Sequence, residues 1–388
     1  MQNFMWDGAS RIIFGKDTET ETGKWVKKYG GKKVLLHYGG GSIKKNGIFD
    51  KVAKALKNEG IDMVEFGGVV PNPILSKVRE GIEFCRKNGA DFILPVGGGS
   101  VIDSAKAIAV GVPYSGDVWD FAEGKARPEK ALPVGVVLTL PAAGSETSRY
   151  TVITNEKTLL KRDVVIENNE IIRPKFAIMN PEFTYSLSDF QTGCRIVDIM
   201  AHGMERYFTR VKNNDLSDKL LENLIKSVMK NGLIVVKEPK NYDARAEIMW
   251  AGSIVHNDIL GVGRGGDWIS HRIGMALSAL YDATHGATLS MIFPAWMEYM
   301  YKEYPEPFIK LAVNIFGVEY DFESPDRTIL EGIRRLRSFY SAIGMPTNLR
   351  EGNIPTDNFA RVAELTEKIG DIKKIDNSDV IEILKLAM

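Results

Sequence analysis

Cysteine is scarce in this sequence. Only Cys85 and Cys194 are present among 388 residues. Two distant cysteines form neither a disulfide framework nor a CxxC metal pair. Any metal site must therefore use other ligands.

The chain also lacks an excess of charge of either sign. Fifty Lys and Arg residues balance fifty Asp and Glu residues, so the formal net charge is zero. This balance excludes a global basic field that would attract nucleic acid or an acidic membrane. We therefore expect neither nucleic acid nor a membrane as a partner.

Long hydrophobic runs are absent as well. The mostly apolar stretch 131–144 is interrupted by proline and glycine and falls short of the roughly 20 residues that span a bilayer. The N-terminus has no basic start, apolar middle and small-residue cleavage site of a secretory signal. We expect a cytoplasmic protein.

What is present is typical of a folded globular protein. Hydrophobic residues make up 44% and charged residues 26% of the chain. A length of 388 residues leaves room for two or three cores at about 150 residues per domain.

Short apolar runs alternate with helical periodicity in the first half. Runs at 34–38, 62–66, 91–96 and 133–138 predict strands of a parallel, doubly wound sheet. From about residue 188 onward helical periodicity dominates. We therefore predict an α/β dinucleotide-binding domain over residues 1–186 and an all-helical domain over residues 187–388.

Two GGGS segments, 39–42 and 97–100, follow predicted strands. Backbone N–H groups and a helix N-terminus can converge there on phosphate. Neither segment has the GxGxxG pattern, and a strand-to-helix turn also uses glycine without any ligand. Asp103 follows the second segment and can reach a ribose or carboxamide group, whereas Lys106 can equally face solvent.

The first glycine segment contains no carboxylate that would accept a ribose 2′-OH and repel a 2′-phosphate. NADP is therefore admissible beside NAD, and we favour NADP. Lys44 and Lys45 follow the segment, and they can also be a solvated helix start.

Four of the five histidines fall in the second half of the chain. Asp198 and His202 are four residues apart, which places them on one helix face. His271 and His285 are fourteen apart and lie either on one helix or on two, if a new segment begins at 282–286. One carboxylate with three imidazoles suits Fe(II) or Zn(II), although a single histidine is more often a core or surface residue.

Taken together, the motifs resemble those of the iron-containing alcohol dehydrogenase family, most closely its butanol dehydrogenase-like, aldehyde-reducing branch. The resemblance covers nearly the whole chain. It rests on the segments FGKDT (14–18), YGGGSIKKNG (38–47), PNP (71–73), VGGGSVIDSAKAIA (96–109), TLPAAGSETS (139–148), VITNEKTLLK (152–161), the Asp198 and His202 segment, and GRGGDWISHRIG through HGATLSMIFPAW.

This resemblance implies a dehydroquinate synthase-like fold, in which a dinucleotide-binding domain and a helical domain enclose a cleft. The implied ligands of one divalent metal, Fe(II) or Zn(II), are Asp198, His202, His271 and His285, which we also expect to be the catalytic set. The residues expected at the cofactor are Gly39, Gly40, Gly41, Ser42, Gly97, Gly98, Gly99, Ser100, Asp103, Thr139, Ser145 and Lys161. We also expect a homodimer.

Two positions depart from the family pattern. Ala143 stands where relatives often place threonine, and Met275 stands where they usually have a histidine four residues after the third metal ligand. His256 is a weak candidate to replace that histidine.

The implied activity is NAD(P)H-linked interconversion of aldehydes and primary alcohols such as butanol, by hydride transfer. Trp268 and Met275 favour an aliphatic or aromatic substrate. The alternatives are a glycerol- or diol-type dehydrogenase, a dehydroquinate-synthase-like lyase that uses NAD catalytically, and a nucleotide-binding homologue with impaired catalysis.

Overall fold

The computed structural model describes residues 1–6, 8, 10–142 and 144–388. The chain folds into two compact units. One comprises Asp7–Tyr185, and the other comprises Met1–Trp6 together with Ser186–Met388. We call them the nucleotide unit and the helical unit.

A six-stranded sheet forms the centre of the nucleotide unit. The strand order is β1-β8-β5-β4-β2-β3, and every pairing is parallel. Strands β4, β5 and β8 are buried along their whole length, as a parallel sheet covered on both faces requires. The strands are β1 Arg11–Phe14, β2 Lys33–Tyr38, β3 Asp62–Phe66, β4 Phe92–Gly97, β5 Gly135–Leu138 and β8 Phe176–Met179.

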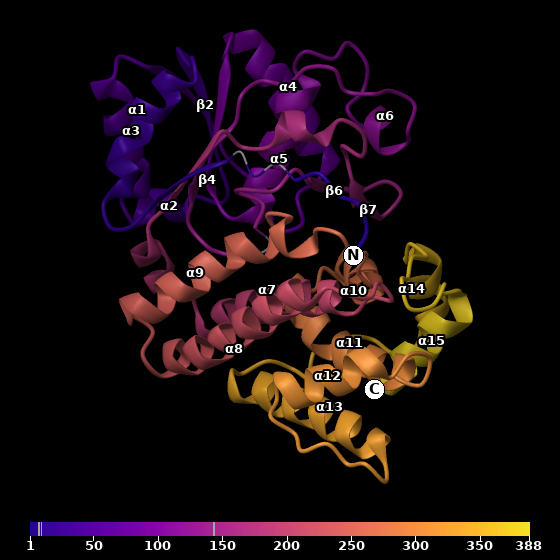
Figure 1. The fold of residues 1–388 in the computed structure, drawn as a ribbon. Helices are drawn as coiled ribbons and strands as arrows, with labels where there is room; N and C mark the ends of the chain where they lie inside the picture. The colour runs from indigo at the N-terminus through magenta and orange to yellow at the C-terminus, as the bar shows by residue number, and fades with distance from the viewer. Residues whose placement is uncertain (7, 9, 143) are drawn as a thin grey trace. The chain divides into compact units, whose positions relative to one another are not determined.

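Helices cover both faces of this sheet. In Figure 1, α1 and α3 lie on one side of it, and α4 and α5 lie on the other. The α/β fold class predicted for this part of the chain is confirmed. The helices are α1 Thr22–Lys28, α2 Ser42–Lys45, α3 Ile48–Asn58, α4 Leu75–Asn88, α5 Gly99–Gly111 and α6 Trp119–Ala122.

The sequence pattern does not indicate β1, β8 or the antiparallel hairpin of β6 Val152–Asn155 and β7 Leu160–Asp163. Each of these strands has four residues. A run of four residues is too short to show the alternation of apolar and polar residues that indicates a strand.

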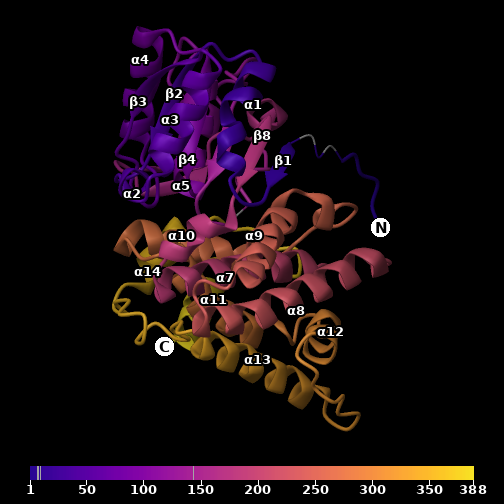
Figure 2. The same ribbon diagram turned by 90° about the vertical axis from the view of Figure 1, so that its left-hand side faces the viewer.

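The helical unit has no strand in residues 186–388, all of which the structure describes. Helix α7 packs against α8, α9 and α11, and Figure 2 shows α7, α8 and α9 side by side. The all-helical class predicted here is confirmed. The helices are α7 Asp189–Tyr207, α8 Asp215–Lys237, α9 Tyr242–His256, α10 Ile269–Tyr281, α11 His285–Met300, α12 Glu306–Asn314, α13 Pro325–Ala342, α14 Phe359–Leu365 and α15 Asn377–Leu386.

The first six residues pack with the helical unit, whereas the sequence pattern groups them with the nucleotide-binding domain. The Met1 ammonium donates a hydrogen bond to the Lys212 carbonyl at 2.7 Å. The Gln2 N–H donates to the Gly263 carbonyl at 2.8 Å. These contacts join segments more than 200 residues apart, so local sequence patterns contain no signal for them.

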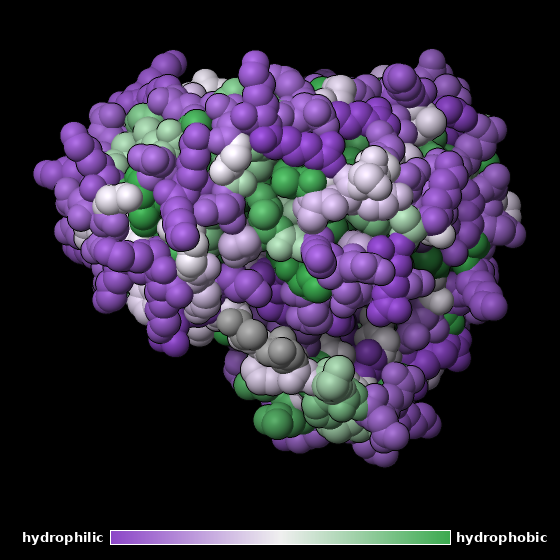
Figure 3. Space-filling model, turned by 90° about the horizontal axis from the view of Figure 1, so that it is seen from above, coloured by the Kyte–Doolittle hydropathy of each residue, from purple (hydrophilic) through white to green (hydrophobic). Residues whose placement is uncertain are grey.

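Polar residues cover most of the face drawn in Figure 3, and hydrophobic residues show there in small groups. Among the described residues, no helix combines the length and the apolar character needed to cross a membrane.

His37 is a fully buried histidine of β2, two residues before the first glycine segment. Its Nδ1 donates to the Phe66 carbonyl at 2.7 Å, and its Nε2 pairs with the Ser104 hydroxyl at 2.9 Å. A carbonyl only accepts, so Nε2 is the acceptor for Ser104. Burial lowers the pKa of His37 to about 4, and the residue therefore belongs to the packed interior.

This lowered pKa predicts a pH-dependent stability of the nucleotide unit. The unfolded chain binds a proton at His37 below pH about 6.5, while the folded chain resists it down to pH about 4. Stability that is present at pH 7 is therefore lost as the pH falls through this window, by roughly 3 kcal/mol. Urea unfolding of the wild type and of His37→Gln at several pH values should show a flatter pH dependence in the variant. Equal slopes would contradict this role.

Candidate metal centre and nucleotide-binding turns

Helix α7 carries the first two residues of the predicted metal site. Its N-terminus is capped by Ser188, whose hydroxyl accepts the Gln191 N–H at 3.2 Å. Asp198 and His202 lie four residues apart on this helix, and both are buried. The His202 Nδ1 donates to the Asp198 carbonyl at 2.8 Å, which leaves the lone pair of His202 on Nε2.

Two further helices bring the other predicted ligands. His271 lies in α10, and His285 is the first residue of α11, so a new helix does begin in the 282–286 region. Gly286 permits a close approach of α11 to α7, since a Cβ there would lie 2.1 Å from the Cys194 carbonyl oxygen.

The donor atoms of these residues converge. The Asp198 Oδ1 lies 3.6 Å from the His271 Nε2 and 3.8 Å from the His285 Nε2. Asp198, His202 and His271 can each offer one donor atom, all within 4.8 Å of one another. A tetrahedral ion with bonds of about 2.1 Å separates its ligand atoms by about 3.4 Å. The spacing therefore fits one small divalent ion.

Two of these atoms are buried without a hydrogen bond, namely the Asp198 Oδ1 and the His271 Nε2. Leaving a buried polar atom unsatisfied costs roughly 1–3 kcal/mol. A shared cation would satisfy both atoms at once, so the residues present fit a metal ion.

The charges in the cluster agree with this interpretation. Burial alone would raise the pKa of Asp198, but the imidazoles of His202, His271 and His285 lower it well below its ordinary value. Burial alone would lower the pKa of His271, but the Glu205 and Asp198 carboxylates raise it to about 9. The cluster therefore attracts positive charge, and a bound proton at His271 competes with a metal.

In the nucleotide unit, the two glycine turns lie next to each other. The first follows β2 and the second follows β4, and these strands are adjacent and parallel. From β2 the chain passes to β3 on one side and later to β4 on the other. The turns therefore flank the topological switch point, where open α/β sheets bind ligands.

The backbone of the turns suits a ligand that approaches closely. Gly41 has φ +96°, which favours glycine, and Gly40 has open space where a Cβ would lie. Ser42 begins α2, while Gly97 ends β4, and Gly98 precedes α5, whose first residues are Gly99 and Ser100.

Asp103 and Ser145, both predicted at the cofactor, are bonded to each other. The Ser145 hydroxyl donates to the Asp103 Oδ1 at 2.6 Å, and the Val152 N–H donates to the Oδ2 at 3.2 Å. Lys106 is fully buried and donates to the Ser145 hydroxyl at 3.0 Å. It does not face solvent, and burial lowers its pKa to about 8.

The last two predicted cofactor residues lie just after β5 and on the hairpin. The Thr139 N–H donates to the Gly97 carbonyl at 3.0 Å, which ties the end of β5 to the second glycine turn. Lys161, in β7, donates from Nζ to the Asn72 side chain at 2.9 Å.

Comparison with known proteins gives a family for both parts of the chain. The model described as "Iron-containing alcohol dehydrogenase" matches residues 9–181, and "Fe-containing alcohol dehydrogenase family, C-terminal" matches residues 192–388. The chain belongs to the iron-containing alcohol dehydrogenase family. The resemblance inferred from the sequence, including the butanol dehydrogenase-like branch, is thereby confirmed, and the protein is an oxidoreductase.

Individual relatives extend over the whole chain. A probable NADH-dependent butanol dehydrogenase 2 of Bacillus subtilis is 39% identical and covers 100% of both chains. An NADPH-dependent aldehyde reductase of Escherichia coli is 32% identical over 98% of this chain and 97% of its own. The crystal structure of an NADH-dependent butanol dehydrogenase A from Thermotoga maritima matches with a TM-score of 0.95 and 41% identity, over 100% of this chain and 99% of that one.

Of the two departures from the family pattern, only one can be located. Met275 is buried in α10, one helical turn after His271, and its sulfur lies 3.7 Å from the Arg272 Nη1. Ala143 lies outside the described residues. His256 ends α9, with its ring centroid 4.5 Å from that of His202.

Sequence reasoning missed Glu205 and Glu65. Glu205 lies seven residues after Asp198 on α7, is fully buried, and contacts the His271 Nδ1. A spacing of seven residues is about two helical turns, so the sequence could have placed Glu205 on the same face of the helix as Asp198. Glu65 lies near the end of β3, where its carboxylate pairs at 2.6 Å with the ammonium of Lys44 in α2, and only the tertiary fold reveals that contact.

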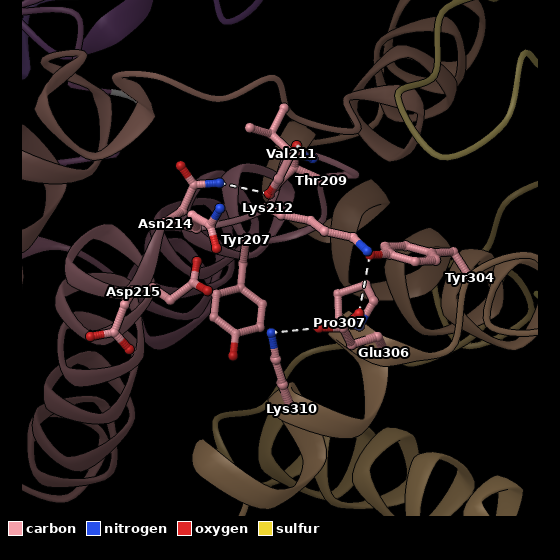
Figure 4. Close-up of a pocket in the computed structure, with 12 residues that line it drawn as sticks. Tyr207, Thr209, Val211, Lys212, Asn214, Asp215, Tyr304, Glu306, Pro307 and Lys310 are labelled. Atoms are coloured by element: carbon pink, nitrogen blue, oxygen red, sulfur yellow. Dashed lines mark hydrogen bonds and ion pairs between the residues drawn. The ribbon is translucent and has the colours of Figure 1, made fainter. Parts of the chain in front are cut away.

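A hollow of about 320 Å³ opens on the helical unit, and Figure 4 shows it. Its walls include Tyr207, Asn214, Asp215, Tyr304 and Lys310. The Lys310 ammonium already pairs with Glu306 at 2.8 Å. None of the predicted site residues lines this hollow, so it is distinct from the candidate metal centre.

Removal of one ligand should empty the metal site. Asp198→Ala or His271→Ala should lose bound iron or zinc and abolish turnover, because three remaining ligands hold the ion more weakly. Elemental analysis with an activity assay measures both effects, and circular dichroism should show an intact fold. One metal per chain and full activity in both variants would rule out the assignment.

Proposed function

We propose that this iron-containing alcohol dehydrogenase reduces aldehydes to primary alcohols, such as butanol, with NAD(P)H, and catalyses the reverse reaction. The convergence of the Asp198 Oδ1 with the Nε2 atoms of His271 and His285 carries the proposal. The paired glycine turns at the topological switch point support it from the nucleotide unit.

The chain's own residues have separate tasks in this reaction. Asp198, His202, His271 and His285 hold the divalent ion, Fe(II) or Zn(II), and Asp198 partly neutralises its charge. When bound, the ion supplies a Lewis acid for the carbonyl oxygen, and the reduced nicotinamide supplies the hydride.

The nucleotide unit supplies orientation. Gly39–Ser42 and Gly97–Ser100 offer backbone N–H groups to the pyrophosphate and adenosine ribose. Asp103, Ser145 and Lys106 form one hydrogen-bonded set, which fixes the Ser145 hydroxyl. Thr139 and Lys161 complete the proposed cofactor contacts.

The substrate we propose is an uncharged aliphatic or aromatic aldehyde. Trp268 is the N-cap residue of α10, the helix that carries His271, and Met275 lies within that helix. Relatives also include 1,3-propanediol dehydrogenases, 28–29% identical to this chain, and a diol-type activity is therefore the second candidate.

One assay separates the candidate functions. After reconstitution with Fe(II) or Zn(II), the protein should oxidise NADPH or NADH when given butanal, with stoichiometric formation of butanol. Turnover without net cofactor oxidation would indicate a lyase. A preference for diols in the reverse direction would indicate the diol-type enzyme, and no turnover with any substrate would indicate an impaired homologue.

For the cofactor, we propose that NADP(H) is accepted and favoured over NAD(H). The turn 39–42 has no carboxylate to repel a 2′-phosphate, and the neighbouring Glu65 carboxylate is already paired with Lys44. The names of the relatives include both NADH-dependent and NADPH-dependent enzymes. We therefore base the proposed cofactor preference on the residues of this turn.

Gly40→Asp tests the cofactor proposal. The open space at Gly40 accepts a side chain without a clash, and the new carboxylate should repel the 2′-phosphate by about 1–3 kcal/mol. The ratio of kcat/KM for NADPH to that for NADH should fall accordingly. A wild type that uses NADH far better than NADPH would contradict the proposal.

Met275 shapes the substrate side of the site under this proposal. A thioether cannot relay a proton at neutral pH, so the proton of the product hydroxyl would have to come from a group other than this side chain. Met275→His should then change KM across aldehydes of different size and leave kcat for small aldehydes within a few-fold. A tenfold rise in that kcat, with chemistry rate-limiting, would instead show that the native enzyme lacks an efficient relay.

The cytoplasmic location and the homodimer stay predictions from the sequence. Analytical ultracentrifugation of the metal-loaded protein measures the second of these directly.

A further inference from the structure

We propose that Glu205 and Arg206, consecutive residues of α7, fix opposite tautomers on two neighbouring imidazoles and so decide which of them binds the metal. Glu205 makes His271 a ligand, and Arg206 keeps His256 out of the coordination shell. Both are positioning residues. The inference rests on the proposed metal site and adds to it the reason why only three of the four clustered histidines are ligands.

Glu205 acts on His271 through two contacts. Its side chain is fully buried. Its Oε1 accepts the backbone N–H of His271 at 3.1 Å, and its Oε2 contacts the ring Nδ1 of the same residue. The Glu205 Oε2 and the His271 Nδ1 are in contact without the geometry of a hydrogen bond. A carboxylate oxygen has no hydrogen of its own, so this contact is favourable only when Nδ1 carries the ring hydrogen, and the lone pair is then on Nε2. That Nε2 faces the Asp198 Oδ1 at 3.6 Å.

His202 has the same tautomer for a different reason. Its Nδ1 donates to the carbonyl oxygen of Asp198 within the same helix. By this argument, the lone pair of both imidazoles is on Nε2. A carboxylate or carbonyl that accepts from the remote ring nitrogen is the usual partner of a metal-binding histidine.

Arg206 imposes the reverse arrangement on His256. Its Nη2 lies 2.7 Å from the His256 Nδ1, and guanidinium has no acceptor atom, so Nδ1 must accept. The hydrogen of the neutral ring then resides on Nε2. Arg206 is itself held in place, because its Nη1 donates to the His202 carbonyl at 3.0 Å and its guanidinium lies 4.6 Å from the Trp268 ring centroid.

A histidine in this state has no lone pair for a metal. One ring nitrogen accepts from Arg206, and the other carries a hydrogen. His256 therefore stays outside the coordination shell, although its ring centroid lies only 4.5 Å from that of His202. One carboxylate and three imidazoles would then hold the ion, and the fourth imidazole of the cluster would not be a ligand.

Nuclear magnetic resonance of the zinc-loaded protein, with ¹⁵N-labelled histidine, tests the inference directly. The chain has five histidines, and single substitutions assign their ring signals. We expect His202 and His271 with the hydrogen on Nδ1 and His256 with the hydrogen on Nε2. A hydrogen on Nδ1 of His256, or zinc on Nδ1 of His271, would overturn the inference.

Substitution of Glu205 tests its role by metal affinity. Glu205→Gln should weaken zinc binding roughly 10- to 100-fold in competition with a chelator. Glu19→Gln is the matched control, because Glu19 is also fully buried and belongs to the other unit, where it pairs with Lys51. The control should bind zinc within threefold of the wild type. Equal affinity in Glu205→Gln and the wild type would overturn the role of Glu205.

Substitution of Arg206 tests the other half. Arg206→Met removes the guanidinium that donates to the His256 Nδ1, so the ¹⁵N signals of His256 should differ from those of the wild type. Unchanged signals of His256 would overturn the role of Arg206. If Glu205→Gln or Arg206→Met does not fold, the ¹⁵N measurement of the histidine tautomers in the wild type still tests the inference. A wild type that binds no zinc would overturn the proposed metal site and this inference together, whereas the outcomes above overturn this inference alone.

Discussion

The buried carboxylate of Asp198 is the constraint on which the helical unit depends. An ionised carboxylate in a protein interior is costly unless opposite charge and hydrogen-bond donors surround it. Here the compensation comes from α7 itself and from the first turns of α10 and α11. The close approach of α11 at Gly286 and the buried contact of Glu205 with His271 both serve this convergence. The contacts that pack α7, α10 and α11 together are therefore also the contacts that bring the proposed metal ligands together.

In the nucleotide unit, the proposed cofactor contacts depend mainly on backbone groups. Two strands whose connections run in opposite directions along the sheet place two glycine turns side by side. The buried Lys106 contributes a positive charge, and its hydrogen bond to Ser145 links it to Asp103. The Lys106 ammonium and the Asp103 carboxylate therefore lie at the two ends of one hydrogen-bonded set.

Much of this arrangement could be predicted from local patterns. Strand, glycine turn and helix follow one another within a short stretch around Gly39 and Gly97, and a four-residue spacing joins Asp198 to His202. The rest depends on contacts between distant segments. Burial of Lys106 requires the carbonyls of 148 and 150, and the ion pair of Glu65 with Lys44 joins β3 to α2. The four-residue β8 lies between β1 and β5, and no local periodicity distinguishes such a strand from a loop.

The central claim is that one divalent ion is held by one carboxylate and three imidazoles in the helical unit. X-ray absorption spectroscopy of the zinc-loaded wild type measures this directly. The account predicts nitrogen and oxygen ligands at about 2.0–2.2 Å, with the outer-shell scattering of three imidazoles. A sulfur ligand, or scattering from one imidazole or none, would contradict it.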